Sequence, residues 1–137
     1  MAYEKPCFSH TFPASTGLMQ YQAVAISGAN NRLIKPTTEG NCIGILVSSG
    51  TTGSTGRAGS TDSGSVQTVQ ILGISKLLCG TTSIDPGDII KAATDGRGST
   101  SSSTSYRLGI ALGSAASTTT SAEVISVLLS PNYAAFA

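Results

Sequence analysis

Apolar residues alternate with polar or small residues in seven segments, a pattern typical of half-buried β-strands. The longest segment runs from Val66 to Leu78, and its alternation changes phase at Gly73, which predicts a β-bulge or a barrel corner there. Pro131 ends the last segment, because proline cannot donate a backbone hydrogen bond. The seven predicted strands cover residues 21–27, 32–35, 41–48, 66–78, 88–94, 106–112 and 123–129.

Turn signals separate these strands. Residues 28–31 (GANN) predict a turn, Pro86-Gly87 a type II turn and Asp95-Gly96 a tight turn. Residues 50–64 contain almost no aliphatic side chain, so they cannot bury enough apolar area to offset the entropy of ordering. We expect a flexible insertion over 50–64, dispensable for folding, and a second polar tip over 98–105.

The order of these segments predicts one all-β domain, a small β-barrel or sandwich of about seven strands. Residues 1–20 are polar and interrupted by proline, which indicates an extended N-terminal arm without a regular element. The β-barrel-like domain then spans 21–130, and 131–137 form a C-terminal tail. Residues 42–50 (CIGILVSSG) are similar to 107–115 (RLGIALGSA), as two equivalent strands packed through small residues would be, although one such pair does not establish a repeat.

The composition narrows the function classes. Charged residues make up only 11% of the chain and its formal net charge is +1, with the basic residues scattered rather than clustered. Nucleic-acid binding needs clustered Lys and Arg, so we expect no nucleic-acid partner. No apolar run has the length of a membrane span and no signal peptide is visible, so we expect no membrane association and synthesis in a cytoplasm.

No set of side chains predicts an active site. The single histidine, His10, forms only a Cys-x-x-His pair with Cys7, which is too few ligands for a metal. One disulfide is possible among the three cysteines, but Cys42 and Cys79 lie in apolar strands, where we expect each thiol to be free, buried and unreactive. Asp85 and Asp88 flank a turn and are expected to cap it. We therefore predict no catalytic residue, no cofactor, no metal and no enzymatic activity.

The order of the motifs resembles one known family. A strand with AVAI precedes RLIKPTTEGNCIGILV and the long strand VQTVQILGISKL, and IDPGDIIKAATDGRG, YRLGIALGSA and EVISVLL follow. This order, over about residues 21–130, is similar to the capsid decoration (cement) proteins of tailed bacteriophages, long classed as a domain of unknown function. The sequence departs from that pattern by its insertion at 50–64.

The resemblance implies a role as well as a fold. It implies a structural virion protein, made in a host bacterial cytoplasm, that coats the outer surface of the phage head and stabilises the lattice of the major capsid protein. It also implies self-association, commonly as a homotrimer. The alternative is a receptor-binding or adhesive β-domain such as a fibre or spike component, which the exposed Ser/Thr/Gly loops would suit.

Aromatic residues suggest where such contacts lie. Five of the seven Phe and Tyr residues fall in the two terminal segments, and aromatic side chains are enriched in interface hot spots. The alternative is that the chain ends dock on their own domain and bury these rings. The predicted interface residues are Tyr3, Phe8, Phe12, Tyr133 and Phe136.

Overall fold

The structure is a computed structural model. It describes residue 2 and residues 4–37, 42–48, 64–101, 107–116 and 123–132. For residues 131 and 132 it describes the backbone alone. Most of the predicted insertion at 50–64, together with Tyr3, Tyr133 and Phe136, lies outside the described residues. The described part contains strands and turns and no helix, which confirms the all-β prediction.

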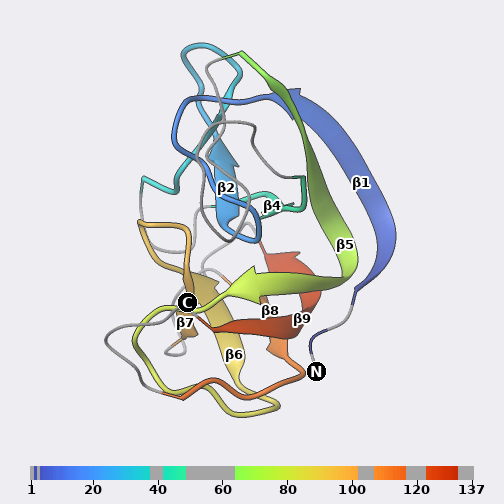
Figure 1. Cartoon of the computed structure of the whole chain (residues 1–137), viewed down its shortest axis with the longest axis vertical. Helices are drawn as coiled ribbons and strands as arrows, with labels where there is room; N and C mark the ends of the chain where they lie inside the picture. Colours follow the sequence, from blue (N-terminus) through green and yellow to red (C-terminus); the bar gives the residue numbers. More distant parts are fainter. Residues whose placement is uncertain are drawn as a thin grey trace.

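In the described part of the chain, nine strands form one curled antiparallel sheet, a half-barrel (Figure 1). Their order in the sheet is β3-β2-β4-β5-β9-β8-β6-β7, and β1 also pairs with β5. Because β5 pairs with β1, β4 and β9, it joins the two halves of the molecule. The strands are β1 (Lys5–Pro13), β2 (Ala23–Ile26), β3 (Leu33–Ile34), β4 (Gly44–Leu46), β5 (Val66–Leu78), β6 (Ile89–Ala92), β7 (Gly98–Thr100), β8 (Arg107–Ala111) and β9 (Val124–Asn132).

All seven predicted strands are present, and two strands were not predicted. β1 lies in the segment expected to be an arm without a regular element; its side chains are almost all exposed, so it carries no alternating apolar signal. β7 lies in the predicted polar tip and is held by its ladder with β6. β9 continues past Pro131 to Asn132, where a register shift between Arg107 and Gly109 accommodates the proline.

The predicted irregularity at Gly73 is confirmed. Its φ is +104°, and the pairing of β1 with β5 changes register on both sides of Phe8, next to this glycine. β5 bends sharply in this region, running first beside β1 and then beside β9 (Figure 1). The bend lets one strand serve both halves of the sheet.

The two halves have the same topology. In the first, the β2–β3 hairpin is followed by β4, which pairs with β2 and with β5. In the second, the β6–β7 hairpin is followed by β8, which pairs with β6 and with β9. We call β1–β4 unit 1 and β5–β8 unit 2. The first strand of each unit and its last strand both pair with the strand that follows the unit: β1 and β4 pair with β5, and β5 and β8 pair with β9. β5 is therefore equivalent to β1 as a first strand and to β9 as a following strand.

The equivalence extends to individual residues. After β1, Ala14 forms a parallel bridge with Leu33, and after β5, Cys79 forms the same bridge with Gly98. The hydrogen bond from Ala14 N–H to the Ser65 carbonyl (2.8 Å) corresponds to the one from Cys79 N–H to the Glu123 carbonyl (2.7 Å). The structure is therefore an internal duplication.

β4 and β8, which lie within the similar segments 42–50 and 107–115, are equivalent strands of the two units. Gly44 pairs with Val24 of β2, and Gly109 pairs with Ile90 of β6. A Cβ on either glycine would collide with a backbone carbonyl of the next strand and approach a valine Cγ1 to 2.9 Å. Each glycine is thus required by the close approach of two strands.

The buried apolar side chains of the sheet form two clusters. The smaller cluster lies in unit 1 and also includes Val69 of β5. The larger fills unit 2 and also takes in Ala23, Cys42 and Ile45 from unit 1, so the two units share a core. The members of the smaller cluster are Ala14, Leu18, Val24, Leu33, Leu46 and Val69.

Candidate functional site

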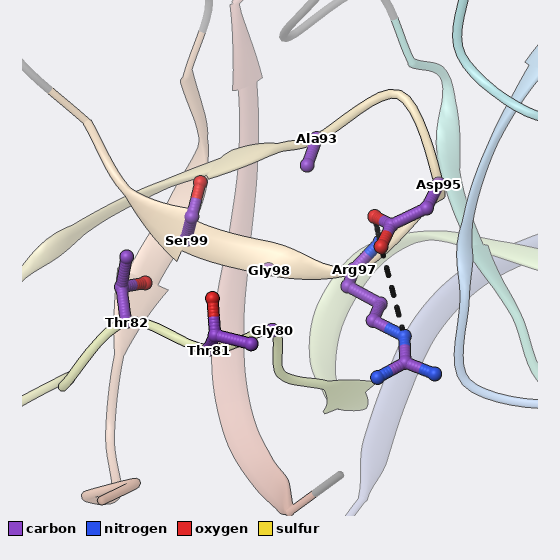
Figure 2. A pocket seen from close by; sticks show the side chains of 8 residues that line it. All are labelled: Gly80, Thr81, Thr82, Ala93, Asp95, Arg97, Gly98 and Ser99. Atoms are coloured by element: carbon purple, nitrogen blue, oxygen red, sulfur yellow. Dashed lines mark hydrogen bonds and ion pairs between the residues drawn. The ribbon is translucent and has the colours of Figure 1, made fainter. Parts of the chain in front are cut away.

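Two surface cavities open in the described part of the chain, and neither gathers reactive groups. One, of about 250 Å³, lies between the segment after β5 and the β6–β7 hairpin (Figure 2). Its only charged groups are Asp95 and Arg97, which lie 3.7 Å apart (Asp95 Oδ2 to Arg97 Nε) and are both well exposed. Such a surface pair contributes little stability. Among the described residues, no three His, Cys, Asp or Glu side chains are grouped closely enough to hold a metal.

The cysteines are free thiols, as predicted. Cys7 is exposed on β1, whereas Cys42 and Cys79 are buried. Burial raises the pKa of Cys42 to about 12. Burial, with a smaller contribution from the charge of Glu123, raises the pKa of Cys79 to about 11. Both buried thiols are therefore protonated near neutral pH and poor nucleophiles.

Asp88 caps its turn, as predicted, and Asp95 does the same in the next turn. The Asp88 carboxylate accepts a hydrogen bond from Asp85 N–H (2.9 Å), across the turn that contains Gly87. The Asp95 carboxylate accepts one from Arg97 N–H (3.0 Å), two residues on. His10 is exposed on β1, and its ring lies edge-to-face against Phe12 with 4.9 Å between centroids. The described residues contain no helix long and apolar enough to span a membrane.

The structure describes two of the five predicted interface residues, and they differ. Phe8 is 52% exposed and forms a cross-strand pair with Leu72 of β5, itself 46% exposed. Phe12 is partly buried and packs against the unit 1 cluster. Phe8 is therefore available to a partner in this structure, whereas Phe12 belongs largely to the fold.

A second exposed apolar group was not predicted from the sequence. Ile89, Ile110 and Leu128 lie opposite one another in register on three neighbouring strands, β6, β8 and β9. Residues in register share one face of a sheet, so the three side chains form a continuous row, which we call the outer row. Ile89 and Leu128 are 40% and 41% exposed, and Ile110 is partly exposed. Alternation within single strands cannot reveal this row, because the register between the strands creates it.

Comparison with known proteins supports the fold. No protein-family model matches the chain, and no curated protein matches it. Among solved structures, it is similar to the head fiber gp8.5 N base of bacteriophage phi29, with a TM-score of 0.55 and 19% sequence identity. The match covers 90% of this chain and 93% of that one. At this identity the likeness shows a shared fold.

Proposed function

We propose that this chain is a non-enzymatic structural protein of a phage head. The observation that carries the proposal is its fold, which matches a head fiber base over nine-tenths of both chains. The motif order described above supports the same role, since it resembles head decoration proteins.

We further propose that the chain decorates the outer surface of the head, contacts the major capsid protein and acts as a homotrimer. The exposed Phe8–Leu72 pair supports a contact through β1, because covering exposed apolar side chains with a partner removes their surface from water. Tyr3, Tyr133 and Phe136 remain proposed contact residues with Phe8, whereas Phe12 can offer a partner only the part of its ring that the unit 1 cluster leaves exposed.

The stabilisation of a shell by such a protein follows from mass action. A protein that binds only the assembled lattice stabilises it by about 2.7 kcal/mol per site when its free concentration is a hundredfold above Kd. An oligomer that binds several capsid proteins at once gains further from its effective concentration. With a net charge of +1, the chain has little self-repulsion to oppose dense coverage.

The second candidate is a base for a head fibre, since the structural match is itself part of a head fiber. Occupancy of heads separates the two roles. Purified protein is added to expanded heads that lack it, and the bound copies are counted by gel densitometry and cryo-electron microscopy. Decoration predicts coverage at a fixed ratio to the major capsid protein across the whole lattice. A few copies at special positions would support the fibre role, and no binding would contradict both.

A further inference from the structure

The exposed outer row of unit 2 has a buried counterpart in unit 1. By the duplication, Ile89, Ile110 and Leu128 correspond to Ala23, Ile45 and Gln70. Those three residues are also in register on neighbouring strands, β2, β4 and β5. Their exposed fractions are 0%, 0% and 2%. The same face of the repeated unit is thus covered in one copy and, within the described part of the chain, open in the other.

In unit 1 the cover begins with the continuation of the strand that ends the row. β5 bends at Gly73, shortly after Gln70 (Figure 1). The side-chain amide of Gln70 donates hydrogen bonds to the carbonyls of Leu72 (3.1 Å) and Ile74 (2.9 Å), on the two sides of the bend. A residue of the row is therefore covered by residues that follow it in its own strand.

The part of β5 beyond the bend also contacts the other end of the row. Leu77 belongs to the same apolar cluster as Ala23 and Ile45. Leu78 N–H donates a hydrogen bond to the carbonyl of Tyr21 (2.8 Å), just before β2. The second half of β5 is thus part of what covers the row of unit 1.

β9 corresponds to β5, so the residues that follow it correspond to this covering stretch. With Leu128 at the place of Gln70, Pro131 stands at the place of Gly73, and the register of β9 with β8 shifts beside this proline. Residues 133–137 then correspond to residues 75–79 of β5. The structure describes β9 as far as residue 132, so the tail begins where the covering stretch begins.

The path of the covering stretch ends at matching places in the two units. Gly87 corresponds to Tyr21, and both have a left-handed φ. A Cβ on Gly87 would meet no atom within 4 Å, so the surface beside it is open. Phe136 corresponds to Leu78, and β5 reaches Tyr21 with the same number of residues after its bend as the tail has after Pro131.

We infer that the tail, residues 133–137, lies on the outer row of its own chain, as the second half of β5 lies on unit 1. Phe136 N–H then donates a hydrogen bond to the Gly87 carbonyl. Ser101 N–H already bonds the Ile89 carbonyl (2.8 Å), so the tail covers the side chains of the row and does not pair with that edge. Because the tail is joined to β9, its docking is intramolecular and does not depend on protein concentration.

Alternation along an extended chain decides which tail side chains meet the row. Tyr133, Ala135 and Ala137 correspond to Ser75, Leu77 and Cys79, all of which are buried. Tyr133 and the two alanines therefore face the row, and covering the row removes its apolar surface from water. Tyr133 can offer a shell protein only the part of its ring that the row leaves open, whereas Phe136 lies on the opposite face of the tail.

This inference does not rest on the proposed role at the phage head, and methyl NMR spectra of the dilute protein test it. Removal of residues 133–137 should move the methyl signals of the outer row, because the row loses its cover. Tyr133→Ala in the full chain should move them too, since they lose the ring current of the tyrosine, and this variant leaves the rest of the tail in place. Val66 is the matched control: it is 69% exposed, lies outside the row and should keep its signal in both. Row signals that move in neither variant would overturn the inference.

Cross-linking separates the chain's own tail from a second copy. In a Cys7→Ser background, Ala135→Cys is combined with Ile89→Cys, because Ala135 corresponds to Leu77, which shares a cluster with the counterpart of Ile89. Oxidation should close a disulfide within one chain, to the same extent at every protein concentration. Ala135→Cys combined with Val66→Cys is the control and should not close. Disulfide-linked dimers in place of closed monomers would assign the row to a second copy and overturn the inference, as would the absence of any disulfide.

Discussion

Tyr21 and Gly87 occupy the same position in the two units and share an unusual backbone conformation. Their φ angles are +68° and +96°, in the left-handed region. Tyr21 N–H donates to the Leu46 carbonyl (2.7 Å), and Gly87 N–H donates to the Ala111 carbonyl, its equivalent, at 2.8 Å. The fold thus demands a left-handed residue before the second strand of each unit. Unit 2 meets the demand with glycine, whereas unit 1 holds a tyrosine there against its preference.

The first prediction concerns the conformational cost at this position. A Cβ on Gly87 would meet no atom within 4 Å, so Gly87→Ala changes only the backbone preference. We expect a loss of about 1 kcal/mol in the free energy of unfolding, measured by urea denaturation. At the equivalent position, Tyr21→Gly should be more stable than Tyr21→Ala by a similar amount. Gly28→Ala is the control, since Gly28 has open space and no left-handed φ, and it should be neutral or slightly stabilising.

The sequence predicted the turns well because their chemistry is local. Pro86-Gly87 and Asp95-Gly96 form turns as expected, and both glycines have positive φ. The phase change at Gly73 also predicted the irregular pairing of β5 with β1. By contrast, Tyr21 gave no signal, because a tyrosine in the left-handed region is held there by its surroundings and not by its own preference.

The second prediction uses the glycines that let neighbouring strands approach. In Gly44→Ala, the new methyl group would collide with the Gln70 carbonyl, and in Gly109→Ala with the Leu128 carbonyl. Backbone atoms cannot move aside as a flexible side chain can, so each variant should lose about 1–3 kcal/mol or more. Because the sites are equivalent, the two losses should be similar, by urea denaturation. An unchanged midpoint in either variant would contradict the close packing described for that strand.

The third prediction concerns the buried thiols and alkaline pH. The folded-state pKa values of Cys42 and Cys79, about 12 and about 11, lie above the ordinary value of 9.0. Above about pH 9 the unfolded chain therefore loses protons that the folded chain keeps, and stability falls as pH rises. Each thiol adds at most about 1.4 kcal/mol per pH unit to this slope. The slope between pH 9 and 11, from urea denaturation, should be shallower in Cys42→Ala/Cys79→Ala than in the unaltered protein.

A thiol titration provides the control for this interpretation. At pH 8 in the folded protein, a thiol reagent should modify Cys7, which is exposed, much faster than the two buried cysteines. In denaturant all three should react. Fast modification of Cys42 or Cys79 in the folded state would show that the core opens readily, and the pH argument would then fail.

The duplication was only partly visible in the sequence, for a physical reason. Gly44 and Gly109 match because each lies against a neighbouring backbone, which tolerates no side chain. Elsewhere the equivalent positions have different surroundings: Ala23 is buried in the core that the units share, whereas Ile89 is exposed. Equivalent positions therefore carry different residues, and backbone features, namely strand register, hydrogen bonds and φ angles, show that they correspond.

The last prediction separates folding from binding in β1. Removal of the first twelve residues would delete most of a strand that pairs with β5, so the truncated chain should be destabilised whatever its role in binding. Single substitutions avoid this difficulty. Phe12→Ala removes a ring that packs on the unit 1 cluster, and it should lower the free energy of unfolding by about 1–2 kcal/mol, since only part of a ring worth about 1.5–3 kcal/mol is buried.

Phe8→Ala provides the contrast within the same strand. Phe8 is 52% exposed and contacts Leu72 across the ladder, a pair worth at most about 1 kcal/mol, so most of the stability should remain. If Phe8 contacts the phage head, this variant should keep its melting temperature within a few degrees and yet bind heads weakly in the occupancy assay. Thr11→Ala, an exposed change on the same strand, should bind as the unaltered protein does. Full occupancy of heads by Phe8→Ala would show that Phe8 is not part of the proposed contact. The variant stays folded, so its head binding reports on the contact alone.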